Sequence, residues 1–507
     1  MAKHYKQSLA DRLTTRERFL WFIPPGIFLL AGILGEKTSL EVAGGCVALL
    51  LLGYFVNRPG IALITLIIFL PLETVGFSLL YRIGVPGPLL RGLSEMKELI
   101  VVAIVLAGLR VIRDTGRKLD RIDVALLTYV GVVVLYLIIP HLFSANAPTL
   151  LNQRLVGFRS DAFYPLIFFG CRHAPLGTHY KERFMQVILY LGGGIALLGL
   201  YQKVAARSWQ NFIFHTARVQ IYEVRVLNSL PSAVEKNLGY VTSLSPLRIG
   251  SVFLGPFALG DYTIIVATLA ALRIRQNHRE WLPYAVLAVS LAANFFTGSR
   301  SDGLALIVVL VLVAVPNAKT PVEGRLRLIA GIVLAAVLIV PALAGTRDVG
   351  AHGGGKSASG HLSEIQDGLH LIETVPFGLG LGDQPGDSIR FANEQKVIYG
   401  GDISDNSITQ VGDELGVQAL LPWLLMVAFI FLALKRRASS GDFFATVMGL
   451  SLLGVMIAAQ YHQAFLDYPL PWTLWGGAGL ALSATQRPDY EDSEYPMTSA
   501  MAAPSVR

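Results

Sequence analysis

The sequence predicts an all-α polytopic membrane protein with about fourteen transmembrane helices, on three observations. First, 53% of the residues are hydrophobic and only 15% are charged, whereas a soluble protein carries roughly a quarter charged residues. Second, apolar runs of about 17 to 25 residues, the length that crosses a bilayer, recur along the chain. Third, Lys and Arg gather in short segments between these runs, as in RVIRDTGRKLDR, LRIRQNHREW and ALKRR. The lipid bilayer is therefore the first predicted partner.

The expected spans follow from the apolar runs taken in order. Several contain Gly or Pro, which membrane helices tolerate. Pro71 interrupts the third run and the sixth is short, so twelve or thirteen spans remain alternatives. The ranges are 18–35, 40–56, 60–80, 95–112, 122–142, 158–172, 184–203, 253–273, 281–297, 300–316, 326–345, 416–434, 443–460 and 468–484.

The basic loops predict the orientation, because Lys and Arg concentrate on the cytoplasmic side. An even number of spans then leaves both termini inside, whereas an odd number would move one end. The resulting organisation has two long extracytoplasmic loops. Its expected parts are a cytoplasmic N-terminal segment (1–17), an N-terminal bundle (18–203), a first long loop (204–252), central helices (253–345), a large second loop (346–415), C-terminal helices (416–484) and a disordered cytoplasmic tail (485–507).

The second loop contains HLSEIQDGLHLIETV, in which apolar residues recur at helical spacing. This pattern predicts a short amphipathic helix, which either packs onto the bundle or contacts lipid. The glycine-rich FGLGLGD follows this helix rather than a strand, so a nucleotide-binding loop is excluded. A turn that brings backbone close to a ligand fits better.

Composition argues against several other classes of site. Cys46 and Cys171 both lie in apolar runs, so no disulfide framework is indicated. The net charge of +7 is spread over short loops, which argues against a nucleic-acid partner. His352, His361 and His370 are nine residues apart, a spacing that is not typical of zinc ligands, and we expect these histidines to be structural or solvent-exposed. No metal and no cofactor are therefore predicted.

Three arginines are expected at outer helix mouths. Arg300 lies in FFTGSRSDGLALIVVL, Arg248 in PLRIGSVFLGPFALGDY and Arg159 in LVGFRSDAFYPLIFF. Ionisable groups near the membrane are costly and are commonly functional. A guanidinium presents a planar fork of donors that matches phosphate oxygens, so together the arginines predict a phosphate site. The alternative for Arg300 is an interfacial arginine that reaches toward water.

Four segments occur in an order that resembles the O-antigen ligase and O-antigen polymerase superfamily of bacterial polytopic membrane glycosyltransferases. The resemblance covers the C-terminal half of the chain. The segments are RIGSVFLGPFALGDY (248–262), TGSRSDGLALIVVLVL (297–312), HLIETVPFGLGLGD (370–383) and DNSITQVGDELGVQALL (405–421).

The resemblance implies an inverting glycan polymerase or ligase at the outer face of the bacterial plasma membrane. Such an enzyme moves a saccharide from a polyprenyl-pyrophosphate-linked glycan donor to a hydroxyl of a glycan or lipid acceptor, without a metal. Arg248 and Arg300 correspond to the catalytic arginines that would stabilise the leaving pyrophosphate. The further residues expected to bind donor or glycan are Arg159, Ser299, Asn406, His361, His370 and Gly380.

Asp405 stands where ligases of this family carry a catalytic His. Asn406 follows, nine residues intervene and Gly416 comes next, while Ala419 replaces the second glycine. This departure disfavours a lipid A-type acceptor and favours a polymerase, or a ligase with another acceptor. Asp405 either acts as the general base, which requires a raised pKa, or caps the following helix. Nearby alternatives for the base are Asp402, Asp413 and Glu414.

A transporter or flippase of lipid-linked glycan is the alternative from another class, because it also needs many spans and cationic groups. Transporters commonly show repeated halves and polar residues near the middle of the bilayer. The sequence shows no convincing internal repeat, and its arginines are expected at outer mouths. This asymmetry favours catalysis at one face. A scaffold subunit would leave the polar outer motifs unexplained.

Overall fold

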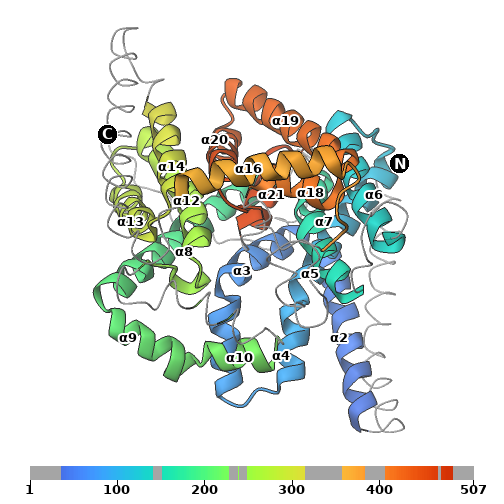
Figure 1. The fold of residues 1–507 in the computed structure, drawn as a ribbon, viewed down its shortest axis with the longest axis horizontal. Coiled ribbons are helices and arrows are strands. Elements are labelled where there is room, and N and C mark those ends of the chain that lie inside the picture. Colours follow the sequence, from blue (N-terminus) through green and yellow to red (C-terminus); the bar gives the residue numbers. More distant parts are fainter. Residues whose placement is uncertain are drawn as a thin grey trace, which may run out of the picture. The chain divides into compact units, whose positions relative to one another are not determined.

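The computed structural model describes residues 36–140, 151–227, 248–314, 357–382, 406–465 and 470–483, with Val234 and Leu238. For residues 36–43 and 357–364 only the backbone is described. Within these ranges every regular element is helical (Figure 1), which confirms the all-α expectation for this part of the chain. The chain divides into two compact units, Met1–Arg58 and Pro59–Arg507.

The first unit contributes helix α2 (Glu36–Asn57), and all other described helices belong to the second unit. Their order along the chain is α3 (Pro59–Arg82), α4 (Gly87–Ser94), α5 (Met96–Thr115), α6 (Arg121–Ile138), α7 (Leu151–His173), α8 (Thr178–Val204), α9 (Ala206–Asn211), η2 (Phe212–Ala217), α10 (Val219–Arg225), η3 (Ser251–Phe253), α12 (Pro256–Gln276), α13 (Trp281–Thr297), α14 (Arg300–Ala314), α16 (Ser357–Thr374), α18 (Ser407–Leu415), α19 (Val417–Ser439), α20 (Phe443–Ala458) and α21 (Leu470–Ala481).

Five of the described helices are long and apolar enough to cross a membrane, namely α3, α6, α8, α12 and α19. Such helices indicate a lipid bilayer environment. Helices α13 and α20 are shorter apolar helices. Two expected spans, 18–35 and 326–345, lie outside the described residues. The total of fourteen therefore stays a prediction.

Helix α12 lies at the centre of the second unit's later half, among α8, α13, α14 and α20 (Figure 1). Every residue from Ala258 to Leu272 is buried. Pro256 occupies the first turn, where its missing N–H costs no hydrogen bond. Arg273 and Arg275 lie in the last turn, where cations interact favourably with the helix dipole. Because α12 is buried on all sides, each polar side chain on it faces other parts of the protein.

A second group of helices forms around α7, which packs against α5, α6 and α21. Small residues allow the backbones to approach, as is common between membrane helices. A Cβ on Gly479 of α21 would lie 2.4 Å from the carbonyl oxygen of Phe168 in α7, and one on Gly170 would lie 2.9 Å from the Ile104 backbone in α5. These contacts require glycine at both positions.

Buried charges within these helices are paired. Lys97 Nζ lies 2.6 Å from Glu73 Oε1, and Arg172 donates a hydrogen bond of 2.6 Å to Asp123 Oδ1. Burying one of these charges without its partner would cost on the order of several kcal/mol of folding free energy, because the ion loses its hydration. These pairs join α3 to α5 and α6 to α7, and so they fix the relation between neighbouring helices.

In the described part of the expected first long loop, 204–252, three short helices, α9, η2 and α10, follow α8 directly. The apolar pattern of the sequence does not predict these helices. Their apolar residues form a small buried cluster that includes Trp209, Ile213 and Val219. Burial of these side chains compensates for the low stability of helices of six or seven residues on their own.

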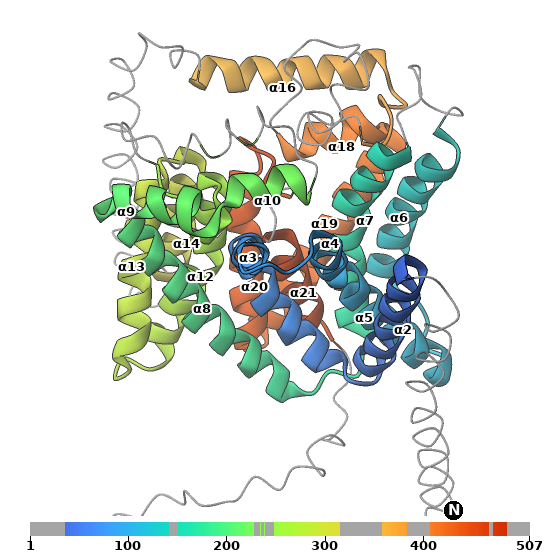
Figure 2. The ribbon, with the colours of Figure 1, turned by 90° about the horizontal axis from the view of Figure 1, so that it is seen from below.

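The amphipathic helix expected in the second loop is confirmed as α16, which lies over α18 (Figure 2). A Cβ on Gly368 would lie 2.9 Å from Thr409, and one on Gly412 would lie 2.4 Å from Ile372. The face of α16 that carries Gly368 and Ile372 therefore packs on α18. This agrees with packing onto the bundle, which was one of the two alternatives for this helix, the other being contact with lipid. Leu369 remains 56% exposed.

Candidate functional site

The turn between α13 and α14 carries the Ser-Arg motif. Helix α13 ends at Thr297, and Gly298 adopts a left-handed conformation with φ +68°. The Ser299 backbone N–H donates to Thr297 Oγ1 at 3.1 Å, and the hydroxyls of Ser299 and Ser301 lie 3.1 Å apart. Arg300 is the first residue of α14. The serines thus shape a tight turn that presents Arg300 at a helix start.

Arg248 lies against this same turn. Its Nε donates a hydrogen bond of 2.7 Å to the Thr297 carbonyl oxygen, and its Cζ lies 4.8 Å from the centre of the Phe257 ring. A Cβ on Gly298 would lie 3.3 Å from Arg248 Nε. The glycine therefore provides the conformation of the turn and space for the arginine. Two motifs separated in sequence meet here.

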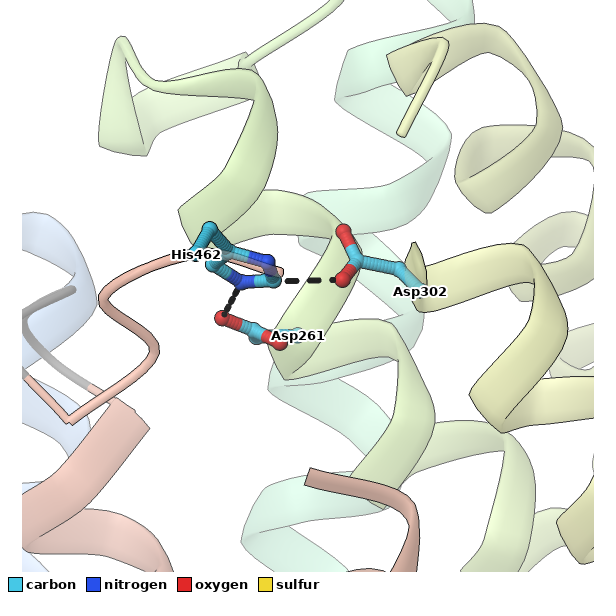
Figure 3. Close-up of side chains that lie close together, drawn as sticks. All are labelled: Asp261, Asp302 and His462. Carbon is cyan, nitrogen blue, oxygen red and sulfur yellow. Dashed lines mark hydrogen bonds and ion pairs between the residues drawn. The ribbon is translucent and has the colours of Figure 1, made fainter. Parts of the chain in front are cut away.

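Beside the turn, Asp261, Asp302 and His462 form a buried cluster (Figure 3). The imidazole Nε2 of His462 lies 2.8 Å from Asp261 Oδ2 and 3.7 Å from Asp302 Oδ1. Both carboxylates have 0% exposed surface and His462 has 5%. Asp261 comes from α12 and Asp302 from α14, whereas His462 lies on the turn that follows α20. Three separate segments therefore contribute one group each.

The other side of the His462 ring faces the Ser-Arg motif. Its Nδ1 lies 3.2 Å from Ser301 Oγ, and the Phe257 ring stacks on the imidazole at a centroid distance of 5.1 Å. One nitrogen thus faces a hydroxyl and the other faces carboxylates. This arrangement can hold a proton between His462 and Asp261, or a cation among the three groups.

The turn that carries His462 is fastened to the start of α18. Ser407 N–H donates to the Ala459 carbonyl oxygen at 3.0 Å, and Ser407 Oγ donates to the His462 carbonyl oxygen at 3.1 Å. The Asn406 side-chain amide donates to the Gln460 carbonyl oxygen at 2.9 Å. The motif that begins at residue 405 is therefore joined to the cluster through three hydrogen bonds.

Asn406 is the N-cap of α18, because its side-chain oxygen accepts hydrogen bonds from the N–H groups of Ile408 and Thr409. It is also 4% exposed. These contacts give Asn406 a structural part in the site. Asp405, the predicted base, lies outside the described residues.

The remaining residues expected to bind the donor fall in different places. Arg159 pairs with Glu98, with 3.6 Å between Nη1 and Oε1, inside a helix that begins earlier than expected, at Leu151. Ser299 is buried within the turn. His370 is exposed on α16, with Nδ1 3.9 Å from Glu373 Oε2. For His361 only the backbone, within α16, is described.

Gly380 belongs to the glycine-rich turn that the sequence placed near a ligand. Its N–H donates to the Glu414 carbonyl oxygen at 2.9 Å, and the N–H of Leu379 donates to the Asp413 carbonyl oxygen at 2.8 Å. The N–H of Gly382 donates to the Glu414 side chain, and Gln153 Nε2 donates to the Gly382 carbonyl oxygen at 2.8 Å. The close backbone approach in this turn is therefore made to α18 and α7.

Sequence reasoning missed His462, which is a single histidine in a short turn. The prediction of no metal rested on the spacing of the histidines in the second loop and on the position of both cysteines in apolar runs. One available signal was Asp261, an ionisable residue inside an apolar run, which by default indicates a functional group with a partner. The partner could not be found without the fold.

A comparison with known protein families and with characterised proteins gives no match to this chain.

Proposed function

We propose that this protein transfers a saccharide from a polyprenyl-pyrophosphate-linked glycan to an acceptor hydroxyl at the outer face of the bacterial plasma membrane. It acts as a polymerase or ligase of cell-surface polysaccharide. One observation supports the proposal most directly. Three of the four segments on which the family resemblance rests contribute residues that contact the turn 459–462. His462 contacts Asp261 of the first and Ser301 of the second segment, and Asn406 and Ser407 of the last are hydrogen-bonded to the turn.

In this proposal the arginines bind the leaving pyrophosphate. Arg248 is held in place by the Thr297 carbonyl and the Phe257 ring, and Arg300 begins α14 a few residues away. The start of a helix also favours an anion through its dipole and its unpaired N–H groups. As the bond between the sugar and the phosphate breaks, negative charge grows on the pyrophosphate, and fixed cations stabilise it without rearrangement.

The acceptor hydroxyl needs a group that takes its proton as it attacks the anomeric carbon. We assign this to Asp405, the immediate neighbour of Asn406. This assignment rests on the family resemblance, and the structure describes only the next residue, Asn406, which is hydrogen-bonded to the turn of His462. Inversion follows if the hydroxyl attacks opposite the leaving pyrophosphate.

A transporter or flippase of lipid-linked glycan remains the second candidate, favoured by one observation. Lys97 and Glu73 form an ion pair whose side chains are 9% and 8% exposed, between two apolar helices. Ionisable residues at such places commonly mark transport pathways.

The deciding experiment reconstitutes the purified chain in proteoliposomes with a polyprenyl-pyrophosphate-linked oligosaccharide. Transferase activity predicts a longer lipid-linked or acceptor-linked glycan together with free polyprenyl pyrophosphate, both visible by mass spectrometry. Movement of unchanged donor between leaflets would support the transporter instead. If neither change occurs with any acceptor glycan tested, the transferase proposal is wrong.

A further inference from the structure

We infer that Asp261, Asp302 and His462 bind one divalent transition-metal cation. This inference goes beyond the proposed transferase activity and does not depend on it. One ligand atom from each residue lies within 4.8 Å of the other two. The residues come from α12, α14 and the turn after α20, so the site exists only in the folded chain.

The distances are close to those of a metal centre. Metal–ligand bonds of about 2.0 to 2.1 Å in a tetrahedral arrangement place ligand atoms roughly 3.3 Å apart. His462 Nε2 lies 2.8 Å from Asp261 Oδ2 and 3.7 Å from Asp302 Oδ1. Shifts of about half an ångström therefore bring Nε2 to ligand spacing from each of these two oxygens, and the ligand atoms of all three residues already lie within 4.8 Å of one another.

Charge also favours a divalent cation. Asp261 and Asp302 have no exposed surface, and within the described chain the Oδ2 atom of Asp302 has no hydrogen-bond donor. Two carboxylates with a neutral imidazole carry a charge of −2, which a divalent cation cancels. Without a cation, protons on the imidazole and on a carboxyl group must neutralise this charge instead, because burying an uncompensated charge is costly.

The surroundings of His462 suit a metal ligand. A ligating histidine usually donates its other ring N–H to a nearby oxygen, which fixes the tautomer. Here Nδ1 lies 3.2 Å from Ser301 Oγ, and that hydroxyl lies 3.1 Å from Ser299 Oγ. With the proton on Nδ1, Nε2 directs its lone pair toward the carboxylates.

Gly260 gives the site its shape. A Cβ at this position would lie 1.8 Å from Asp302 Oδ2. Only glycine therefore allows the Asp302 carboxylate to approach α12 so closely. An alanine here leaves all three ligands in the sequence but displaces one of them.

The ligand types indicate which cations fit. One imidazole and two carboxylates, with no thiolate, suit Zn²⁺ or Mn²⁺. Ca²⁺ fits less well, because it prefers a site made of oxygen ligands only. Bound there, the ion would fasten α12, α14 and the turn after α20 to one another.

The test measures metal binding directly, without any glycan. The full chain, purified with a tag free of histidine and stripped with a chelator, is titrated with Mn²⁺, Zn²⁺ or Co²⁺. We expect one ion per chain by elemental analysis, a Co²⁺ absorption band, and a rise in Tm on addition of the ion. Asp261→Asn, Asp302→Asn and His462→Gln should each abolish the uptake, whereas Gly260→Ala should weaken affinity about 10- to 100-fold.

His278→Ala and Asp114→Asn are matched controls, because both residues are exposed and lie away from the cluster. They should bind the ion as the wild type does. If the stripped wild-type chain binds no ion, or if the Asn and Gln variants that elute as monodisperse protein bind as much as the controls, the site is wrong. Wild-type binding without transferase activity would leave the metal site intact and overturn the proposed function alone.

Discussion

Arg248 donates a hydrogen bond of 2.7 Å from Nε to the carbonyl oxygen of Thr297. This contact joins the segment before α12 to the turn before α14, and so it brings the two arginine motifs to one place. It also fixes one edge of the guanidinium, so that the position of this cation depends on the α13 to α14 turn.

Replacing either Arg248 or Arg300 by Ala should lower glycan transfer roughly 10²- to 10³-fold, the usual effect of removing one group that stabilises the leaving charge. Lys should restore little activity, because it lacks the planar fork of donors. Turnover with purified lipid-linked donor is the measurement. Arg279→Ala, at an exposed position, is the control and should behave as wild type. Full activity of Arg300→Ala at normal expression would exclude the pyrophosphate role.

Asp405→Asn should lower turnover about 10²- to 10⁴-fold if the carboxylate accepts the acceptor's proton. The capping alternative is less attractive, because Asn406 already caps α18. Asn406→Ala should instead lower the free energy of unfolding by about 0.5 to 2 kcal/mol through loss of that cap. Rates of the Asp405→Asn variant are compared at several pH values. Near-normal rates at every pH would show that Asp405 is not the general base. The remaining candidates for the base would then be Asp402, Asp413 and Glu414.

The stability of the chain should depend on pH through Asp413. Burial raises the pKa of this carboxyl from 3.8 to about 7, so the folded chain keeps a proton that the unfolded chain releases. Stability from this group is therefore full below the unfolded pKa and decreases as pH rises toward 7. Asp413→Asn should remove this decrease and raise Tm at pH 8 relative to wild type. If Asp413→Asn and wild type show the same difference in Tm between pH 5 and pH 8, Asp413 is not the source of the pH dependence.

Gly378→Ala should destabilise the chain by about 1 to 3 kcal/mol, because the backbone has a positive φ there. Gly378 has φ +77°, and a Cβ on it would lie 2.5 Å from the Glu414 carbonyl oxygen. Thermal unfolding in detergent measures the effect. Gly131→Ala serves as the control, since a Cβ at this helical position meets nothing within 4 Å. Equal Tm values for both variants would show that the turn does not need glycine.

The expected topology is tested by single cysteines in a chain that lacks Cys46 and Cys171. With both long loops outside, Ser359→Cys and Ser229→Cys should react with an impermeant thiol reagent in intact cells, while Ser440→Cys should not. If only the cysteine at position 440 reacts, the predicted orientation is inverted, and the proposed site does not lie at the outer face.

The sequence predicted the helices well where apolar runs were long, because a helix buried in lipid and a helix buried in protein both require a long apolar run. It failed for α9, η2 and α10, whose few turns are stabilised by contacts such as Trp209 with Phe212 rather than by periodicity. It placed Arg248 and Arg300 in motifs but could not show that Thr297 joins them. His462 was unpredictable, because its partners Asp261 and Asp302 are distant in sequence and become neighbours only through the packing of α12, α14 and α20.

Gly382 and Asn406, which are distant in sequence, both contact one short helix. Gly382 is bound to Glu414 near the end of α18, and Asn406 caps its beginning. Because α18 spans only Ser407–Leu415, the two anchors are about 13 Å apart at 1.5 Å per residue. A change that unfolds α18 should therefore release both contacts at once, so that the glycine-rich turn and the turn of His462 lose their attachment together.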